Sequence, residues 1–157
     1  MGIDLTPQVI VEELIGDVLA RVRSSVPWRP GARELLTDLG RHGIPCALVT
    51  MSYRSLVEPI LAALPAGTFS AVVTGDEVTR GKPHPEPYLR AAALLSVDPT
   101  RCVAIEDSET GTRAAVAAGC QVISAPLHGK VQPGPNRHLH ATLVGLTGDR
   151  LPQAAVR

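Results

Sequence analysis

The chain has 157 residues, of which 45% are hydrophobic and 19% are charged, and its formal net charge at pH 7 is zero. This length and composition are typical of one domain that buries its own core. A neutral chain with 3% aromatic residues lacks the basic surface and stacking platforms of nucleic-acid-binding proteins. It also contains no apolar run of membrane-spanning length and no signal-peptide pattern, so we expect a cytoplasmic protein without a membrane partner.

The three cysteines, Cys46, Cys102 and Cys120, have neither paired nor metal-type spacing. Cys46 and Cys102 lie inside expected strands, and Cys120 follows a glycine that ends an expected helix. We therefore interpret them as small buried residues in a reducing compartment.

Helical and strand-like hydrophobic patterns alternate along the chain, which predicts an α/β fold with a parallel sheet. Prolines, glycines and histidines dominate from residue 126 onward and predict a polar tail loop. In that loop, His128, His138 and His140 have no metal-ligand spacing. In chain order, we expect a helix over 6–24, a helix over 32–41, a strand over 44–50, a helix over 52–64, a strand over 69–74, a helix over 86–95, a strand from 102, a helix over 109–119 and a strand over 121–125.

Turn and cap residues support several of these boundaries. Thr6, Ser52 and Ser108 each stand where a side chain can cap the N-terminus of an expected helix. Gly43 and Gly119 each stand where a helix ends.

Two segments offer groups that bind anions. Thr50 ends the strand over 44–50 with a hydroxyl, and Met51 and Ser52 add backbone N–H groups at a helix start. Lys82 supplies a positive charge from a loop stiffened by neighbouring prolines. Together these groups predict a phosphate-binding site.

Two adjacent acids, Glu106 and Asp107, follow the strand that begins at Cys102. In open parallel sheets, ligands collect beyond the carboxyl ends of the strands. Carboxylate oxygens are the ligands that Mg²⁺ prefers, and Mg²⁺ leaves room for water and a phosphate. The acid pair therefore predicts a metal site next to the anion site.

These segments resemble motifs of the haloacid dehalogenase superfamily of hydrolases, in the small-helical-cap subgroup that includes phosphatases and β-phosphoglucomutases. Val49–Ser52 resembles its second motif, Gly81–Tyr88 its third, and Ile105–Ser108 with Gly111 its fourth. The order and spacing agree, and the resemblance covers about residues 30–125.

The resemblance implies a Rossmann-like three-layer sandwich and an Mg²⁺-dependent phosphatase acting on a small phosphorylated metabolite through an aspartyl-phosphate. It implies that Thr50, Lys82 and Asp107 are catalytic, and that Thr50, Met51, Ser52 and Lys82 bind the phosphoryl group. It also implies that Glu106 and Asp107 hold the metal.

The first motif of the family, an Asp-x-Asp after the central strand of the sheet, has no match here. Asp4 has no strand before it, and Asp17 lies inside an amphipathic pattern, so neither is a credible nucleophile. We therefore expect a weakly active or inactive C-terminal part of a longer enzyme, with 1–26 a remnant of the helical cap and linker and 27–157 the hydrolase core. Without the central strand, unpaired sheet edges would favour self-association.

Other functions remain open. The same fold without a nucleophile could serve as a non-catalytic phosphate- or Mg²⁺-binding or interaction module, and phosphomutase or dehalogenase chemistry is an alternative within the family. A dinucleotide-binding domain is not supported, because no glycine-rich fingerprint follows a strand. The sequence does not identify the substrate.

Overall fold

The structure is a computed structural model that describes residues 6, 9, 16, 20, 26–127 and 129–151. Most of the helix expected over 6–24 lies outside these residues, as do Asp4, Asp17 and His128. No helix in the described part of the chain has the length and apolar character needed to cross a bilayer.

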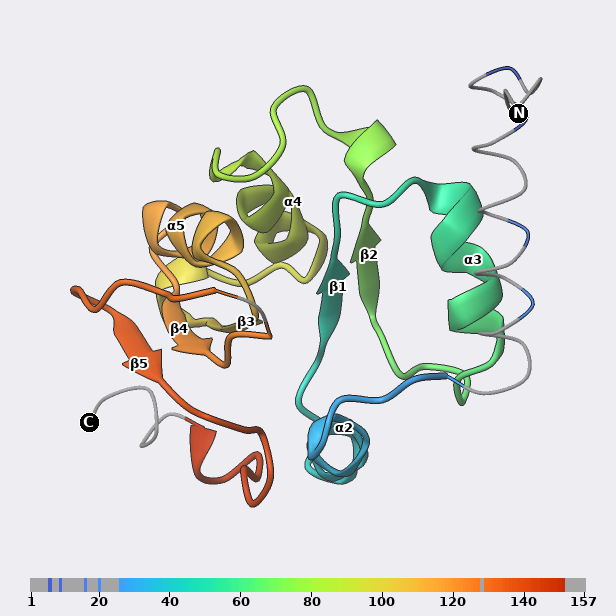
Figure 1. The fold of residues 1–157 in the computed structure, drawn as a ribbon. Helices are drawn as coiled ribbons and strands as arrows, with labels where there is room; N and C mark the ends of the chain where they lie inside the picture. Colours follow the sequence, from blue (N-terminus) through green and yellow to red (C-terminus); the bar gives the residue numbers. More distant parts are fainter. Residues whose placement is uncertain are drawn as a thin grey trace, which may run out of the picture.

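Helices and strands alternate, and every strand pair in the described part is parallel, which confirms the predicted α/β class (Figure 1). The elements are α2 (Ala32–Arg41), β1 (Ala47–Val49), α3 (Arg54–Ala62), β2 (Ala71–Val73), the 3₁₀ helix η1 (Gly75–Glu77), α4 (Glu86–Leu94), the 3₁₀ helix η2 (Pro99–Arg101), β3 (Val103–Glu106), α5 (Glu109–Ala117), β4 (Gln121–Ser124) and β5 (Arg137–Leu139).

The strands form two separate sheets. One contains β1 and β2, and the other has the order β3–β4–β5. The family resemblance implies a central strand between those that end at Thr50 and Asp107, and no described strand pairs with the free edge of β1 or of β3. These two strands also do not pair with each other.

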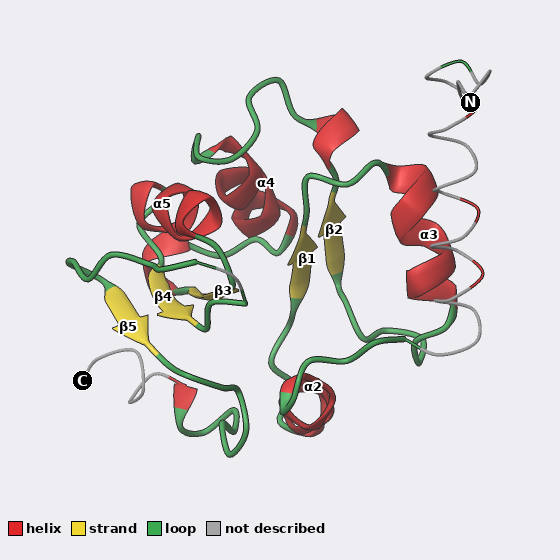
Figure 2. Ribbon diagram, viewed as in Figure 1, coloured by secondary structure: helices red, strands yellow, loops and turns green. Residues whose placement is uncertain are grey.

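The three-stranded sheet lies between two helical layers. Successive side chains of a strand point to opposite faces, so each face can pack against its own helices. Val122 of β4 packs with Tyr88 of α4 and Ala114 of α5. The next residue, Ile123, packs on the opposite face with Leu35 of α2. Figure 2 shows the strands between these helices, as predicted for a three-layer sandwich.

Helix α5 is fixed to β3 and β4 by polar contacts as well as apolar ones. The Ser108 hydroxyl accepts a hydrogen bond from Gly111 N at 3.0 Å, which confirms the predicted cap. Thr112 and Ser124, both fully buried, share a hydrogen bond of 2.9 Å between their hydroxyls. This pair joins α5 to β4 through the core.

Two predictions about local structure are wrong. Ser52 does not cap α3: the N-cap is Tyr53, and the Asp76 carboxylate instead accepts a hydrogen bond from Arg54 N at 3.1 Å. The segment expected to be a polar loop contains β5, in which His138 pairs with Ile123. Arg137, His138 and Leu139 form a strand there because the edge of β4 provides backbone partners.

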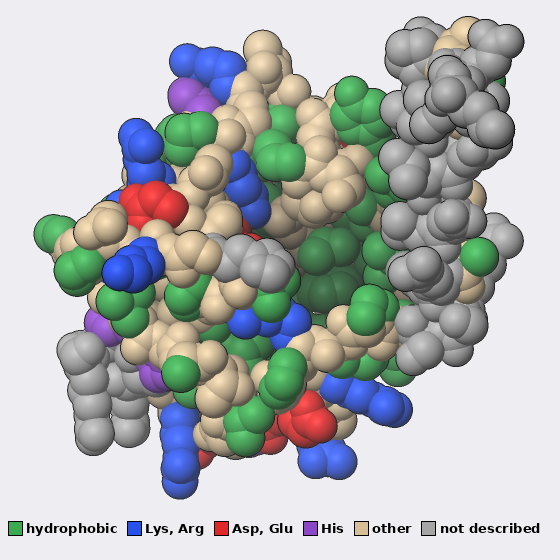
Figure 3. Space-filling view, viewed as in Figure 1, with side chains coloured by type: hydrophobic (Ala, Val, Ile, Leu, Met, Phe, Trp, Pro, Cys, Tyr) green, Lys and Arg blue, Asp and Glu red, His purple; other side chains and the backbone are tan. Residues whose placement is uncertain are grey.

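Figure 3 shows basic and acidic side chains scattered over the viewed surface, with a hollow floored by hydrophobic side chains near its middle. This scatter agrees with the zero net charge of the chain.

Candidate active site

Lys82 joins the ends of the two sheets. Its ammonium donates a hydrogen bond to the carbonyl oxygen of Val49 at 3.0 Å and lies 2.5 Å from Glu106 Oε1. Val49 is the last residue of β1 and Glu106 the last of β3, so the carboxyl ends of both free-edged strands meet at Lys82. The side chains of Lys82 and Glu106 are only 11% and 6% exposed, which makes this a buried ion pair.

The Glu106 carboxylate is held by three donors. Oε1 accepts hydrogen bonds from Lys82 and from the Tyr88 hydroxyl, and Oε2 accepts one from Ser108 Oγ at 3.3 Å. The carboxylate packs against Gly111, where a Cβ would overlap it. Burial, followed by the nearby charge of Glu106, raises the pKa of the Tyr88 phenol, which therefore stays a neutral donor.

Tyr88 contacts both Lys82 and Glu106, although no binding or catalytic role was predicted for it from the sequence. Its ring centroid lies 5.0 Å from Lys82 Nζ, in the range of a cation–π contact. The available signal was its position in the first turn after the Gly-Lys-Pro loop, in a chain with only two tyrosines.

The turn at Thr50–Ser52 lies beside the Lys82 loop. Thr50 N donates to Val73 O at 3.0 Å, and Ser52 N donates to the Thr50 hydroxyl oxygen at 3.1 Å. Met51 Sδ accepts a weak hydrogen bond from Lys82 N at 3.3 Å, which connects the turn to the loop. The predicted phosphate-binding residues are therefore brought together at one edge.

Gly75 supports this turn from the strand β2 side. Gly75 N donates to Ser52 O at 3.0 Å, and a Cβ on Gly75 would overlap the Met51 carbonyl. The adjacent acids also have structural partners: Glu77 forms a bidentate ion pair with Arg54, with contacts of 2.8 Å. Hydrogen bonds from Arg54, and then from Thr74 N, lower the pKa of Glu77 to about 2.

Asp107 differs from Glu106 in its surroundings. It is exposed, and its carboxylate has no hydrogen bond or ion pair with any described residue. Its oxygens therefore suit a hard cation that keeps water ligands, as Mg²⁺ does. The described residues contain no group of three or more His, Cys, Asp or Glu that could hold a metal ion, and the metal role of Glu106 stays a prediction.

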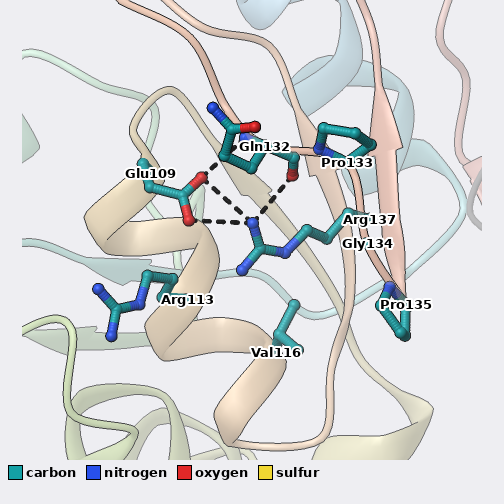
Figure 4. A pocket seen from close by; sticks show the side chains of 8 residues that line it. All are labelled: Glu109, Arg113, Val116, Gln132, Pro133, Gly134, Pro135 and Arg137. Carbon is teal, nitrogen blue, oxygen red and sulfur yellow. Dashed lines mark hydrogen bonds and ion pairs between the residues drawn. The ribbon is translucent and has the colours of Figure 1, made fainter.

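A surface pocket of about 480 Å³ lies away from these residues, between α5 and the segment before β5 (Figure 4). Glu109 accepts hydrogen bonds there from Gln132 N and Arg137, each at 3.0 Å. The Gln132 N–H, and then Arg137, lower the pKa of Glu109. Glu109 and Arg137 are paired with each other in this pocket. None of the predicted site residues lines it.

Cys120 is buried, as predicted, whereas Cys46 and Cys102 are only partly buried and lie just before β1 and β3. Burial raises the pKa of Cys46, Cys102 and Cys120, that of Cys120 to about 12. Their thiols therefore stay protonated at neutral pH.

Comparison with known proteins agrees with this geometry. Residues 4–119 match the model of the haloacid dehalogenase-like hydrolase family. Hexitol phosphatase A of Escherichia coli is 42% identical over 97 residues, covering 60% of this chain and 44% of that protein. Hexitol phosphatase B of the same organism is 34% identical over 120 residues, covering 76% of this chain and 54% of that protein.

Among solved structures, CbbY from Rhodobacter sphaeroides in complex with phosphate superposes with a TM-score of 0.79 and 29% sequence identity, covering 97% of this chain and 71% of that one. The chain spans about half or less of the length of the first curated relatives it matches. The family match extends over most of the chain and includes the Thr50, Lys82 and Glu106–Asp107 segments. The chain therefore belongs to the haloacid dehalogenase-like hydrolases, a family in which its relatives include phosphatases.

Proposed function

We propose that this site binds the phosphoryl group of a small phosphorylated metabolite and that its chemistry is phosphate-monoester hydrolysis. The supporting observation is the Lys82 ammonium, fixed between Val49 O and Glu106 beside the Thr50–Ser52 turn. A buried ammonium with a neighbouring hydroxyl neutralises and orients a phosphate dianion.

Each predicted residue has a task in this proposal. The hydrogen bond from Ser52 N to Thr50 Oγ leaves the Thr50 hydroxyl hydrogen free to point at a phosphoryl oxygen. The Ser52 N–H is used in this contact, so the Met51 N–H is the predicted backbone donor that remains for a phosphate, and Lys82 supplies the charge. The relatives named hexitol phosphatases, and the CbbY structure solved with xylulose-1,5-bisphosphate, make a polyol or sugar phosphate the substrate class that we propose.

Asp107 is the carboxylate that we assign to a divalent cation, with Glu106 as the predicted second ligand. The Asp107 carboxylate has no hydrogen-bond or ion-pair partner among the described residues, whereas Glu106 is engaged by Lys82, Tyr88 and Ser108. When bound, Mg²⁺ would supply positive charge that neutralises the phosphate and the leaving oxygen.

Turnover through an aspartyl-phosphate also needs a nucleophilic Asp. The sequence gives neither Asp4 nor Asp17 the setting of a nucleophile, so we propose weak turnover at most. The second candidate function, a non-catalytic phosphate-binding module, is favoured by the same observation: the anion-binding groups are assembled while the nucleophile is not identified.

Phosphate binding by calorimetry and Mg²⁺-dependent hydrolysis of p-nitrophenyl phosphate test the proposal together. We expect inorganic phosphate to bind the wild type, and Lys82→Met to weaken binding roughly tenfold or more, because a hydrogen bond to a charged group contributes about 1.5–3 kcal/mol. Lys130→Met, at the only other lysine and an exposed one, is the matched control and should bind normally.

The outcomes separate the two functions. Phosphate release that Asp107→Asn abolishes supports a hydrolase. Phosphate binding that needs Lys82, with no release, supports the binding module. A folded wild type that does not bind phosphate contradicts both.

A further inference from the structure

We propose that Tyr88 is a positioning residue, which holds Glu106 against Lys82 and thereby sets the ammonium in the anion site. Its effect on ligand binding rests on the function proposed above, and its effect on Lys82 does not.

One side chain contacts both members of the buried ion pair. The Tyr88 hydroxyl donates to Glu106 Oε1, the same oxygen that Lys82 Nζ contacts. The Tyr88 ring lies 5.0 Å from Nζ. Tyr88 is itself 9% exposed, so solvent does not replace these contacts easily.

The position of the carboxylate decides where the ammonium lies. Lys82 Nζ bonds to Val49 O on one side and to Glu106 on the other, so it is centred only while Glu106 stays in place. The Ser108 contact with Oε2, at 3.3 Å, is long and holds the carboxylate weakly. Tyr88 therefore provides the main restraint on Oε1 besides Lys82 itself.

Lys82 and Tyr88 belong to one continuous segment of the chain. Lys82 lies in the loop that leads into α4, and Tyr88 lies in the first turn of that helix. Tyr88 N donates to Pro85 O at 3.0 Å, which fixes the start of the helix relative to the loop. Glu106 is the last residue of β3, so the Tyr88 hydroxyl connects this segment to β3.

The Tyr88 ring also packs with Ala104, Ala114 and Val122, so a purely structural role in the core is the alternative to test. Tyr88→Phe keeps the ring and removes only the hydroxyl. Tyr53→Phe is the matched control, since Tyr53 is the only other tyrosine and is 64% exposed.

The first measurement needs no ligand. The chain has two lysines, Lys82 and Lys130, so ¹⁵N-lysine labelling gives two side-chain ammonium signals. We expect the buried, bonded Lys82 ammonium to be protected from solvent exchange, with its assignment confirmed by loss in Lys82→Met. Tyr88→Phe should reduce this protection several-fold, while Tyr53→Phe should leave it unchanged. Unchanged protection in folded Tyr88→Phe overturns the proposal.

The second measurement is the dissociation constant of inorganic phosphate. We expect Tyr88→Phe to weaken binding by roughly three- to tenfold in the wild type, the effect of losing about one hydrogen bond. In a Glu106→Gln background it should have no further effect, because Tyr88 acts through that carboxylate. An equal loss in both backgrounds shows a role independent of Glu106 and overturns the proposal. If wild type does not bind phosphate, the proposed function fails, and the ammonium protection still decides the role of Tyr88.

Discussion

At the scale of single residues, the proposed anion site depends on positions where no side chain fits. A Cβ on Gly75 would overlap the carbonyl of Met51, and a Cβ on Gly111 would overlap the Glu106 carboxylate. The Gly75 overlap is with backbone, so it is relieved only if the backbone of the Thr50–Ser52 turn or of residue 75 shifts. Gly75 therefore determines the shape of the turn although it carries no reactive group.

We expect Gly75→Ala to lower the free energy of unfolding by about 1–3 kcal/mol, the usual cost of overpacking, and to weaken phosphate binding. Gly40→Ala is the control, because a Cβ at Gly40 in α2 meets nothing within 4 Å. Replacing a helical glycine by alanine should stabilise the protein by about 0.5–1 kcal/mol. Urea denaturation measures both, and a Gly75→Ala protein as stable as the wild type would contradict the proposed contact.

At the scale of elements, an ion pair connects the start of α3 to the 3₁₀ helix η1. Arg54 binds Glu77 through two nitrogens and also reaches Val72 O at 3.3 Å. Glu77 in turn accepts a hydrogen bond from Thr74 N at 3.0 Å. The turn at Thr50–Ser52 directly precedes α3, and Gly75 at the start of η1 bonds to Ser52 O. The ion pair therefore holds together the two segments that adjoin the turn.

Because the pKa of Glu77 is lowered from 4.5 to about 2 in the folded chain, its ionised form favours folding. This contribution is complete above pH 4.5 and is lost as the pH falls from 4.5 toward 2. We expect Glu77→Gln to be less stable than wild type at neutral pH, with a difference that shrinks on acidification through this window. Thermal unfolding between pH 2 and 7 measures the effect, and a difference that is constant with pH would refute it.

Element boundaries show what the sequence determines locally. The predicted bounds of α2 and the Ser108 cap are confirmed, because hydrophobic spacing and cap chemistry act within a few residues. The cap of α3 comes from Asp76, 22 residues away, and β5 depends on the edge of β4, so no local pattern could predict either.

The candidate site shows the same division. The nearness of the Lys82 loop to the acid pair was predicted, since ligand-binding groups gather beyond the carboxyl ends of parallel strands. The ion pair between Lys82 and Glu106 was not predicted. The contact of the Tyr88 hydroxyl with Glu106 was not predicted either, because the two residues are 18 positions apart and meet only through tertiary packing. The roles predicted for Thr50, Met51, Ser52, Lys82, Glu106 and Asp107 remain proposals for experiment.

At the scale of the whole molecule, the split sheet leaves strand edges without described partners. Cys102 O and Glu106 O both accept hydrogen bonds from the β4 side, so the backbone groups of Val103 and Ile105 face the free edge of β3. Ile105 is also an apolar residue with 37% exposure. Such edges favour pairing with another chain.

We therefore expect concentration-dependent self-association, measured by size-exclusion chromatography with light scattering. Ile105→Lys should reduce it, because a charge at a free edge opposes strand pairing. Leu94→Lys, which introduces the same charge at an exposed position of α4, should not. A wild type that stays monomeric at all concentrations would exclude this interface.

In the proposed function, the bridge made by Lys82 couples anion binding to the spacing of the two sheets. One ammonium holds a carbonyl of β1 and a carboxylate of β3, so an anion that draws on its charge changes the free energy of the cross-sheet contact. Thermodynamic linkage makes this effect reciprocal: if anion binding shifts an equilibrium in the separation of β1 and β3 by some factor, that change in separation shifts anion affinity by the same factor. A strand added at the free edge of β1 or of β3 would act on the proposed anion site in this way.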